Sequence, residues 1–114
     1  MSHAGCGSSG LITADTLVHS GRCKLVSIHG YNAHNTDETT IIVYDNVAAS
    51  GKIVAKLILP GKRSIVLDDT SGGDQAATGY TLTNIEYDMH AVLCDNGLYV
   101  DVTGGTPNMT VEYA

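Results

Sequence analysis

The chain has 114 residues, a formal net charge of −6, and only six Lys or Arg residues against twelve Asp or Glu. This length fits a single domain. The scarcity of cationic side chains argues against nucleic-acid binding, which needs them to displace condensed counterions. No apolar run reaches the ~20 residues of a membrane-spanning helix. The 13 Gly residues, the absence of Trp and Phe and the many Thr and Val residues predict an all-β protein, because β-branched residues favour strands and Gly favours turns.

The N-terminal residues, MSHAGCGSSG, have neither the basic segment nor the apolar segment of a secretory signal. Gly and Ser offer little apolar surface for burial and leave the backbone free to move. We therefore expect a flexible Gly/Ser-rich arm over residues 1–15, followed by a β-sandwich domain over residues 16–114.

Alternation of side-chain character predicts a short strand over residues 16–19 and a longer one over 23–31. In the longer strand Cys23 and Leu25 would share one face, and Val26 and Ile28 the other, so the pattern does not decide which face is buried. After a polar loop over 32–38, strands are predicted over 39–45 and 52–59. The inward candidates of the latter strand are Ile53, Ala55, Leu57 and Leu59.

Pro60 and Gly61 end that strand, and another is predicted over 63–68. Residues 69–78, rich in Gly, Ser and Asp, predict a loop. Further strands are expected over 79–87 and 89–94, and Asp95-Asn96-Gly97 predicts a tight turn, because Asn and Gly tolerate positive φ.

Residues 98–103 and 109–113 alternate with a period of two, which predicts one buried and one exposed face for each. Because Gly104, Gly105 and Pro107 separate them, we expect a hairpin that closes the core with Leu98, Val100 and Val102. Several short strands separated by turns predict an antiparallel β-sandwich of jelly-roll type.

No pattern typical of catalysis or metal binding is found. The histidines at positions 19, 29, 34 and 90 lack the spacing of a metal motif, and DDTSGGD at 68–74 does not match a calcium loop. A nucleophile elbow is also missing. We therefore expect no enzyme activity, no cofactor and no metal. Cys6, Cys23 and Cys94 form no CxxC pair, and the last two are expected in strands as small apolar residues, with a disulfide left open.

The tyrosines suggest an interaction surface, for which the candidates are Tyr31, Tyr80, Tyr87 and Tyr99. Such residues could form a platform for sugars or an interface between subunits, because a phenol buries area while it keeps a polar hydroxyl. Sugar-binding modules usually rely on Trp, which this chain lacks. Both interpretations stay open.

Leu25, the run Tyr44-Asp45-Asn46, Gly51 and, above all, NGLYVDVTGGTPNMTVEY at residues 96–113 resemble small virion proteins of tailed bacteriophages. The resemblance covers about residues 17–113. It implies a capsid decoration (cement) protein, made in the host cytoplasm and carried on the capsid surface of the virion. The implied partners are the major capsid protein and further copies of the chain, with a trimer expected. The alternative is a tail-fibre or receptor-binding module that recognises glycans.

Overall fold

The computed structural model describes residues 6–61, 63–68, 76–81 and 84–114, with no side chains described over 62–83. The strands within these residues are β1 (Gly7–Ser8), β2 (Thr16–Ser20), β3 (Cys23–Asn32), β4 (Thr39–Asp45), β5 (Lys52–Leu59), β6 (Arg63–Asp68), β7 (Ala76–Thr81), β8 (Asn84–Cys94), β9 (Gly97–Thr103) and β10 (Pro107–Tyr113). Over the same residues no helix is long and apolar enough to cross a membrane.

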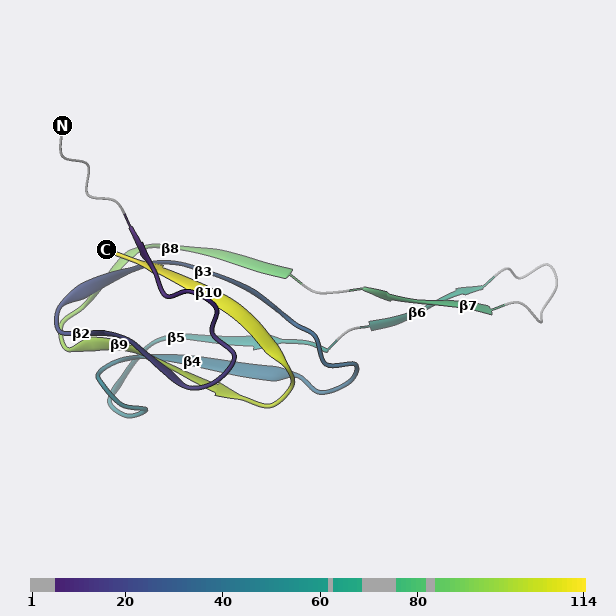
Figure 1. Cartoon of the computed structure of the whole chain (residues 1–114), viewed down its shortest axis with the longest axis horizontal. Helices are drawn as coiled ribbons and strands as arrows, with labels where there is room; N and C mark the ends of the chain where they lie inside the picture. Colours follow the sequence, from purple (N-terminus) through teal and green to yellow (C-terminus); the bar gives the residue numbers. More distant parts are fainter. Residues whose placement is uncertain (1–5, 62, 69–75, 82–83) are drawn as a thin grey trace, which may run out of the picture.

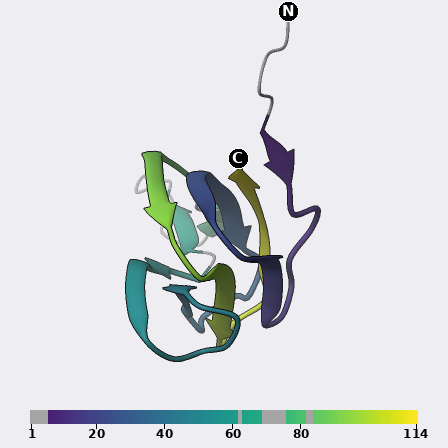
Figure 2. The same ribbon diagram turned by 90° about the vertical axis from the view of Figure 1, so that its left-hand side faces the viewer.

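The strands form two antiparallel sheets that pack face to face (Figure 1, Figure 2). Sheet A has the order β1-β10-β3-β8, and sheet B has the order β2-β9-β4-β5. Strands β6 and β7 pair with each other as a separate two-stranded ribbon that projects from one end of the sandwich (Figure 1). The β-sandwich predicted from alternation and turn residues is thereby confirmed.

Strands that follow each other in the chain mostly lie in opposite sheets. β9 pairs with β2 and β4 in sheet B, whereas β10 pairs with β3 and β1 in sheet A. The prediction that residues 98–113 form a hairpin is therefore wrong, because β9 and β10 lie in different sheets. Gly104 and Gly105, with φ of 80° and 63°, lie in a crossing between the sheets. A period of two decides which face of a strand is buried, but it does not decide which strand is its neighbour.

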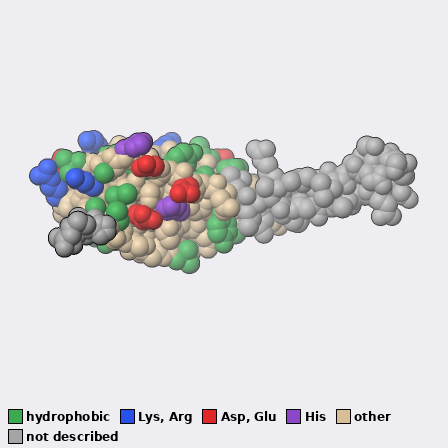
Figure 3. Space-filling view, turned by 90° about the horizontal axis from the view of Figure 1, so that it is seen from above, with side chains coloured by type: hydrophobic (Ala, Val, Ile, Leu, Met, Phe, Trp, Pro, Cys, Tyr) green, Lys and Arg blue, Asp and Glu red, His purple; other side chains and the backbone are tan. Residues whose placement is uncertain are grey.

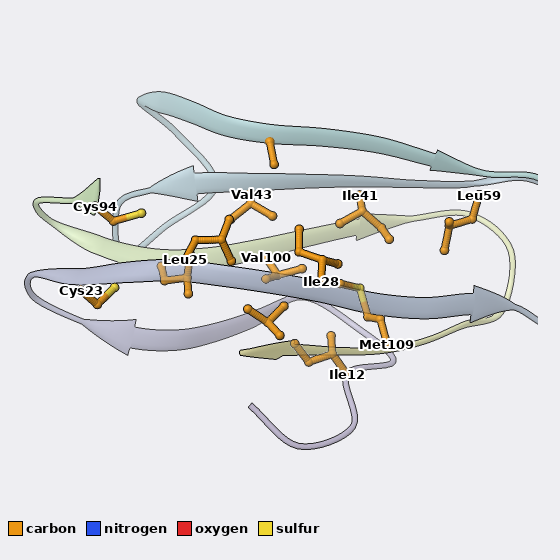
Figure 4. Packing of buried hydrophobic residues seen from close by; sticks show 13 residues of the cluster. Ile12, Cys23, Leu25, Ile28, Ile41, Val43, Leu59, Cys94, Val100 and Met109 are labelled. Atoms are coloured by element: carbon orange, nitrogen blue, oxygen red, sulfur yellow. The ribbon is translucent and has the colours of Figure 1, made fainter. Parts of the chain in front are cut away.

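Apolar side chains from both sheets fill the space between the layers (Figure 4). As predicted, Leu98 and Val100 of β9 are fully buried, and Met109 and Val111 of β10 face them from the other sheet. Each such side chain contributes roughly 1.5–3 kcal/mol by leaving water. The fully or nearly fully buried members of this core are Ile12, Cys23, Leu25, Ile28, Ile41, Val43, Ala55, Leu59, Cys94, Leu98, Val100, Met109 and Val111.

A bulge in β3 resolves the ambiguity of its two apolar faces. Tyr113 of β10 pairs with Leu25, but Glu112 pairs with Ser27, so Val26 is an additional residue in β3. The extra residue switches the alternation, and both Leu25 and Ile28 are completely buried.

Two further expectations for the strands need correction. Ile53 is 50% exposed, because the register shifts between Val43 and Tyr44 and places Ile53 opposite Tyr44 on the outer face.

The strand expected over 79–87 is divided between β7 and β8, and β8 continues through the segment 89–94. His90 and Ala91 in β8 have φ of 53° and 57°, and this kink disturbs the alternation there. Of the predicted loop, residues 69–75 lie outside the described residues and Ala76–Thr78 belong to β7.

The N-terminal arm packs against the sandwich from Gly7 onwards, which differs from the flexible arm expected over residues 1–15. Gly7 and Ser8 pair with Tyr113 and Glu112 of β10. Ile12 is only 1% exposed and exchanges backbone hydrogen bonds with Met109 at 2.7 and 3.1 Å. Backbone pairing with β10 and one buried apolar side chain thus attach a segment rich in Gly and Ser.

Two buried polar side chains fasten the crossings between the sheets. The Asn32 amide donates hydrogen bonds to the carbonyl oxygens of Asp37 and Leu59, and its oxygen accepts from the backbone nitrogens of His34 and Thr106. The Asp45 carboxylate accepts from the backbone nitrogens of Asp95, Asn96 and Gly97. Each side chain satisfies backbone groups that a crossing leaves without a partner in a sheet.

Candidate interaction surfaces

The outer face of sheet B carries an apolar row that crosses all four strands. Leu17 pairs with Tyr99, Tyr99 with Tyr44, and Tyr44 with Ile53. The row spans three inter-strand spacings, about 14 Å. Leu17 is 45% and Ile53 is 50% exposed, so water still contacts both ends of the row.

More apolar surface continues along the strands next to this row. Ile42 lies between Asp101 of β9 and Lys56 of β5, and Ile58, which is 54% exposed, pairs with Thr40. Isolated exposed apolar residues are normal on a protein surface, whereas a contiguous group of them marks an interaction site. The outer face of sheet B has the composition of a protein–protein interface, with Tyr and Ile at its centre and one charge of each sign beside them.

Asp101 is held in an unfavourable environment at the edge of this face. Partial burial raises the pKa of the Asp101 carboxyl, and hydrogen bonding to Asp15 together with its negative charge adds to the rise. Asp15 is itself fixed in place, because its Oδ1 accepts a hydrogen bond of 2.7 Å from the backbone nitrogen of Val102. The ionised form of Asp101 is therefore disfavoured by its surroundings.

The outer face of sheet A is polar and acidic. His29 lies at its centre, with Nε2 at 3.2 Å from Glu112 Oε1 and 3.1 Å from Ser27 Oγ, and Glu86 is its partner on β8. Asp88 pairs with Ser27 in the next row. Figure 3 shows acidic and histidine side chains gathered on this side of the sandwich. The two outer faces thus differ sharply in character.

A shallow groove of about 520 Å³ lies on the same face of sheet A. Tyr31 in the groove pairs with Asn108 on one side and with Asn84 on the other, so an aromatic ring lies between two amides. Leu11 forms part of the rim. A few polar groups around an apolar surface are typical of a small-ligand site.

The four predicted tyrosines do not form one cluster. Tyr31 and Tyr87 belong to sheet A, Tyr99 belongs to sheet B, and the side chain of Tyr80 in β7 lies outside the described residues. Tyr99 lies on the outer face of sheet B, and its aromatic neighbour there is Tyr44. Alternation in TTIIVYD could have identified Tyr44, since it places Thr40, Ile42 and Tyr44 opposite the buried Ile41 and Val43.

The described residues contain no group of three His, Cys, Asp or Glu side chains arranged to hold a metal ion. Three of the histidines lie beside different carboxylates: His29 beside Glu112, His34 at 3.6 Å from Asp37 and His90 at 3.8 Å from Asp88. In the acidic segment 68–74, Asp69 and Asp74 lie outside the described residues, as does the side chain of Asp68.

Comparisons with protein families, with curated proteins and with solved structures find no match to this chain.

Proposed function

We propose that this protein is a structural module that binds to a larger protein assembly through the outer face of sheet B. The observation that carries the proposal is the apolar row of Leu17, Tyr99, Tyr44 and Ile53. Because residues 96–113 resemble small virion proteins of tailed bacteriophages, the assembly that we propose is the phage head. The protein would then be a decoration protein on the capsid surface, bound to the major capsid protein.

The physical argument starts from a core that is complete without the row. The interior is closed by fully buried side chains such as Leu25, Ile41 and Val100, so the row adds nothing to it. Covering Leu17 and Ile53 with a partner would remove more apolar surface from water. Tyr44 and Tyr99 suit such contacts, because few rotatable bonds are immobilised for a large buried area.

A single row is small compared with the ~800 Å² that each partner buries in a standard interface. An oligomer that binds several neighbouring lattice sites at once would compensate for the small area of each contact. After the first copy has bound, the others are held at a high effective concentration near their sites, which raises the overall affinity. We therefore propose that the protein acts as a homo-oligomer, expected to be a trimer. The acidic face of sheet A would remain in contact with water.

The test is co-sedimentation of the full chain with assembled capsids of its phage. Leu17→Lys and Ile53→Lys should each weaken binding by roughly ten- to a hundredfold, the value of one buried aliphatic side chain. Thr110→Lys, on the outer face of sheet A, is the matched control and should bind like the unmodified chain. Unchanged binding by both row variants, with circular dichroism showing an intact fold, would refute the proposal.

Light scattering after size exclusion tests the oligomer separately. A trimer that separates into monomers on Ile53→Lys would place the row between subunits, whereas a trimer that persists but no longer binds capsids would place it against the lattice. A stable monomer that does not bind capsids would contradict both parts of the proposal.

The groove on sheet A favours a second function, that of a receptor-binding module for glycans. The aromatic ring of Tyr31 offers an apolar face on which a sugar can stack. Asn84 and Asn108 supply amide donors and acceptors on either side of it. Binding to a glycan array that is lost in Tyr31→Ala but kept in Tyr99→Ala would support this function. Absence of binding to any glycan would exclude it.

A further inference from the structure

Cys23 and Cys94 face each other across two neighbouring strands. Cys23 is the first residue of β3, Cys94 is the last of β8, and the two are register partners in sheet A. They are 5% and 0% exposed, and the Cys94 thiol donates a long hydrogen bond of 4.0 Å to the carbonyl oxygen of Val92. Figure 4 shows both at the same end of the core. Both thiols are free in the structure, as is that of the exposed Cys6.

We propose that Cys23 and Cys94 form a reversible cross-strand disulfide that joins β3 to the edge strand β8 when a small-molecule disulfide is available as the oxidant. One cysteine thiolate attacks a sulfur of glutathione disulfide and releases one glutathione. The thiolate of the second cysteine then attacks the mixed disulfide and releases the second glutathione. Two protein thiols are oxidised and one glutathione disulfide is reduced. This goes beyond the proposed function and does not depend on it.

The backbone permits this bond without a large rearrangement. Directly opposed residues in an antiparallel pair have Cα atoms about 4.5–5.5 Å apart, within the 4.4–6.8 Å found in disulfides. Lys24 exchanges backbone hydrogen bonds with Ala114, so the N–H and C=O groups of Cys23 point towards β8. Cβ atoms in a pair of this type are about 5.5 Å apart. A disulfide needs about 3.8 Å, so closure would strain the bond and make it easy to reduce.

The environment of the thiols predicts slow oxidation at neutral pH. Burial, with contributions from Cys23 and the Asp45 carboxylate, raises the pKa of Cys94 to about 11. Burial also raises the pKa of Cys23. Since the thiolate is the attacking species, the rate should increase with pH throughout the range below that value. Because β8 is an edge strand, local opening there can admit the oxidant.

The cross-link would change stability more than structure. It would close a loop that contains most of the chain, and long loops lose the most conformational freedom in the unfolded state. It would also fasten the edge strand of sheet A, β8, to its neighbour β3. The oxidised protein should therefore unfold at a higher temperature than the reduced protein.

The test uses the full-length Cys6→Ala variant, incubated in the folded state with glutathione disulfide at mildly alkaline pH. Intact mass should fall by two hydrogen atoms without added glutathione, and peptide mapping should link residue 23 to residue 94. The melting temperature should rise, and dithiothreitol should reverse both changes. The double variants Cys6→Ala/Cys23→Ala and Cys6→Ala/Cys94→Ala should show neither change.

Three outcomes would overturn the proposal. The first is two free thiols in the folded protein after a treatment that fully cross-links the chain in urea. The second is a product that carries glutathione on both cysteines. The third is a cross-linked product that melts below the reduced protein.

Discussion

The Oδ1 atom of Asp45, at the end of β4, lies 2.7 Å from the backbone nitrogen of Asn96, 51 residues later in the chain. The same carboxylate accepts from the nitrogens of Asp95 at 3.0 Å and Gly97 at 3.4 Å. One side chain of sheet B thereby holds the segment in which the chain passes from β8 to β9. These donors, that of Asn96 first, lower the pKa of the Asp45 carboxyl.

Replacing Asp45 with Asn should destabilise the protein. The amide keeps the size of the side chain but loses the charge and turns a donor towards backbone N–H groups. Hydrogen bonds to a charged group contribute about 1.5–3 kcal/mol, so we expect a loss of about 2 kcal/mol in urea unfolding at neutral pH. Asp95→Asn, whose side chain is 66% exposed, is the matched control and should change little.

The pH dependence of that loss has a defined sign. Because the pKa of Asp45 is lowered in the folded state, its stabilisation is complete above the unfolded value of 3.8 and disappears as pH falls through the folded value. The difference between the two proteins should therefore be constant near neutrality and shrink below 3.8. A difference that persists fully in strong acid would assign the effect to packing.

Asp101→Asn should have the opposite effect. The pKa of Asp101 is raised by burial and by Asp15, so its ionised form destabilises the fold. The unmodified protein loses that part of its stability as pH rises through the raised pKa. The variant should be more stable at neutral pH and equal in strong acid, as measured by thermal melts across this range. Glu38→Gln, which removes the charge of an exposed carboxyl elsewhere, is the matched control.

Gly105→Ala should cost more than Gly21→Ala, although both glycines have positive φ, 63° and 94°. A Cβ on Gly21 would contact nothing, so strain of about 1 kcal/mol is the only cost. A Cβ on Gly105 would lie 2.7 Å from Asn32 Oδ1 and would also collide with Thr39. We expect at least twice the loss in chemical unfolding. Equal losses would show that the crossing can move away from Asn32.

Ile12→Ala should destabilise the protein by about 2–5 kcal/mol, the range for large-to-small changes in a core. Leu11→Ala is an adjacent control, because Leu11 is 68% exposed and Ile12 is 1% exposed. Comparison of the two melting temperatures separates docking of the N-terminal segment from general effects of truncation. Similar behaviour of both variants would mean that this segment is not attached in solution.

Alternation in the sequence predicted most strands and most of the core, because a strand with one buried face must carry apolar residues at every second position. It could not predict that β9 and β10 belong to different sheets, since either arrangement buries Leu98 and Met109 equally well. Alternation also failed as a guide where an extra residue in a strand reverses which positions face the core. The bulge at Val26 lets Leu25 and Ile28 both face inward, and the shift at Tyr44 moves Ile53 outward.

The candidate surfaces were harder to predict than the fold. Tyr31, Tyr87 and Tyr99 stay candidates for an interface, but their grouping depends on strand order, which single residues do not encode. Alternation in TTIIVYD places Tyr44 on the outer face of β4, but its position beside Tyr99 depends on β4 lying between β9 and β5. The N-terminal segment is attached by backbone pairing with β10, which its sequence does not encode, and by the buried side chain of Ile12, which is a weak signal among Gly and Ser neighbours.

Repeated passage of the chain between the two sheets has a consequence for biosynthesis. β10 is the last of the described strands to leave the ribosome, yet it occupies the place between β1 and β3. Until it arrives, β1 has no neighbour and β3 lacks one of its two, so a nascent chain must keep apolar strands apart for most of translation. Such a protein should fold late and slowly, with the closing of sheet A as its final step.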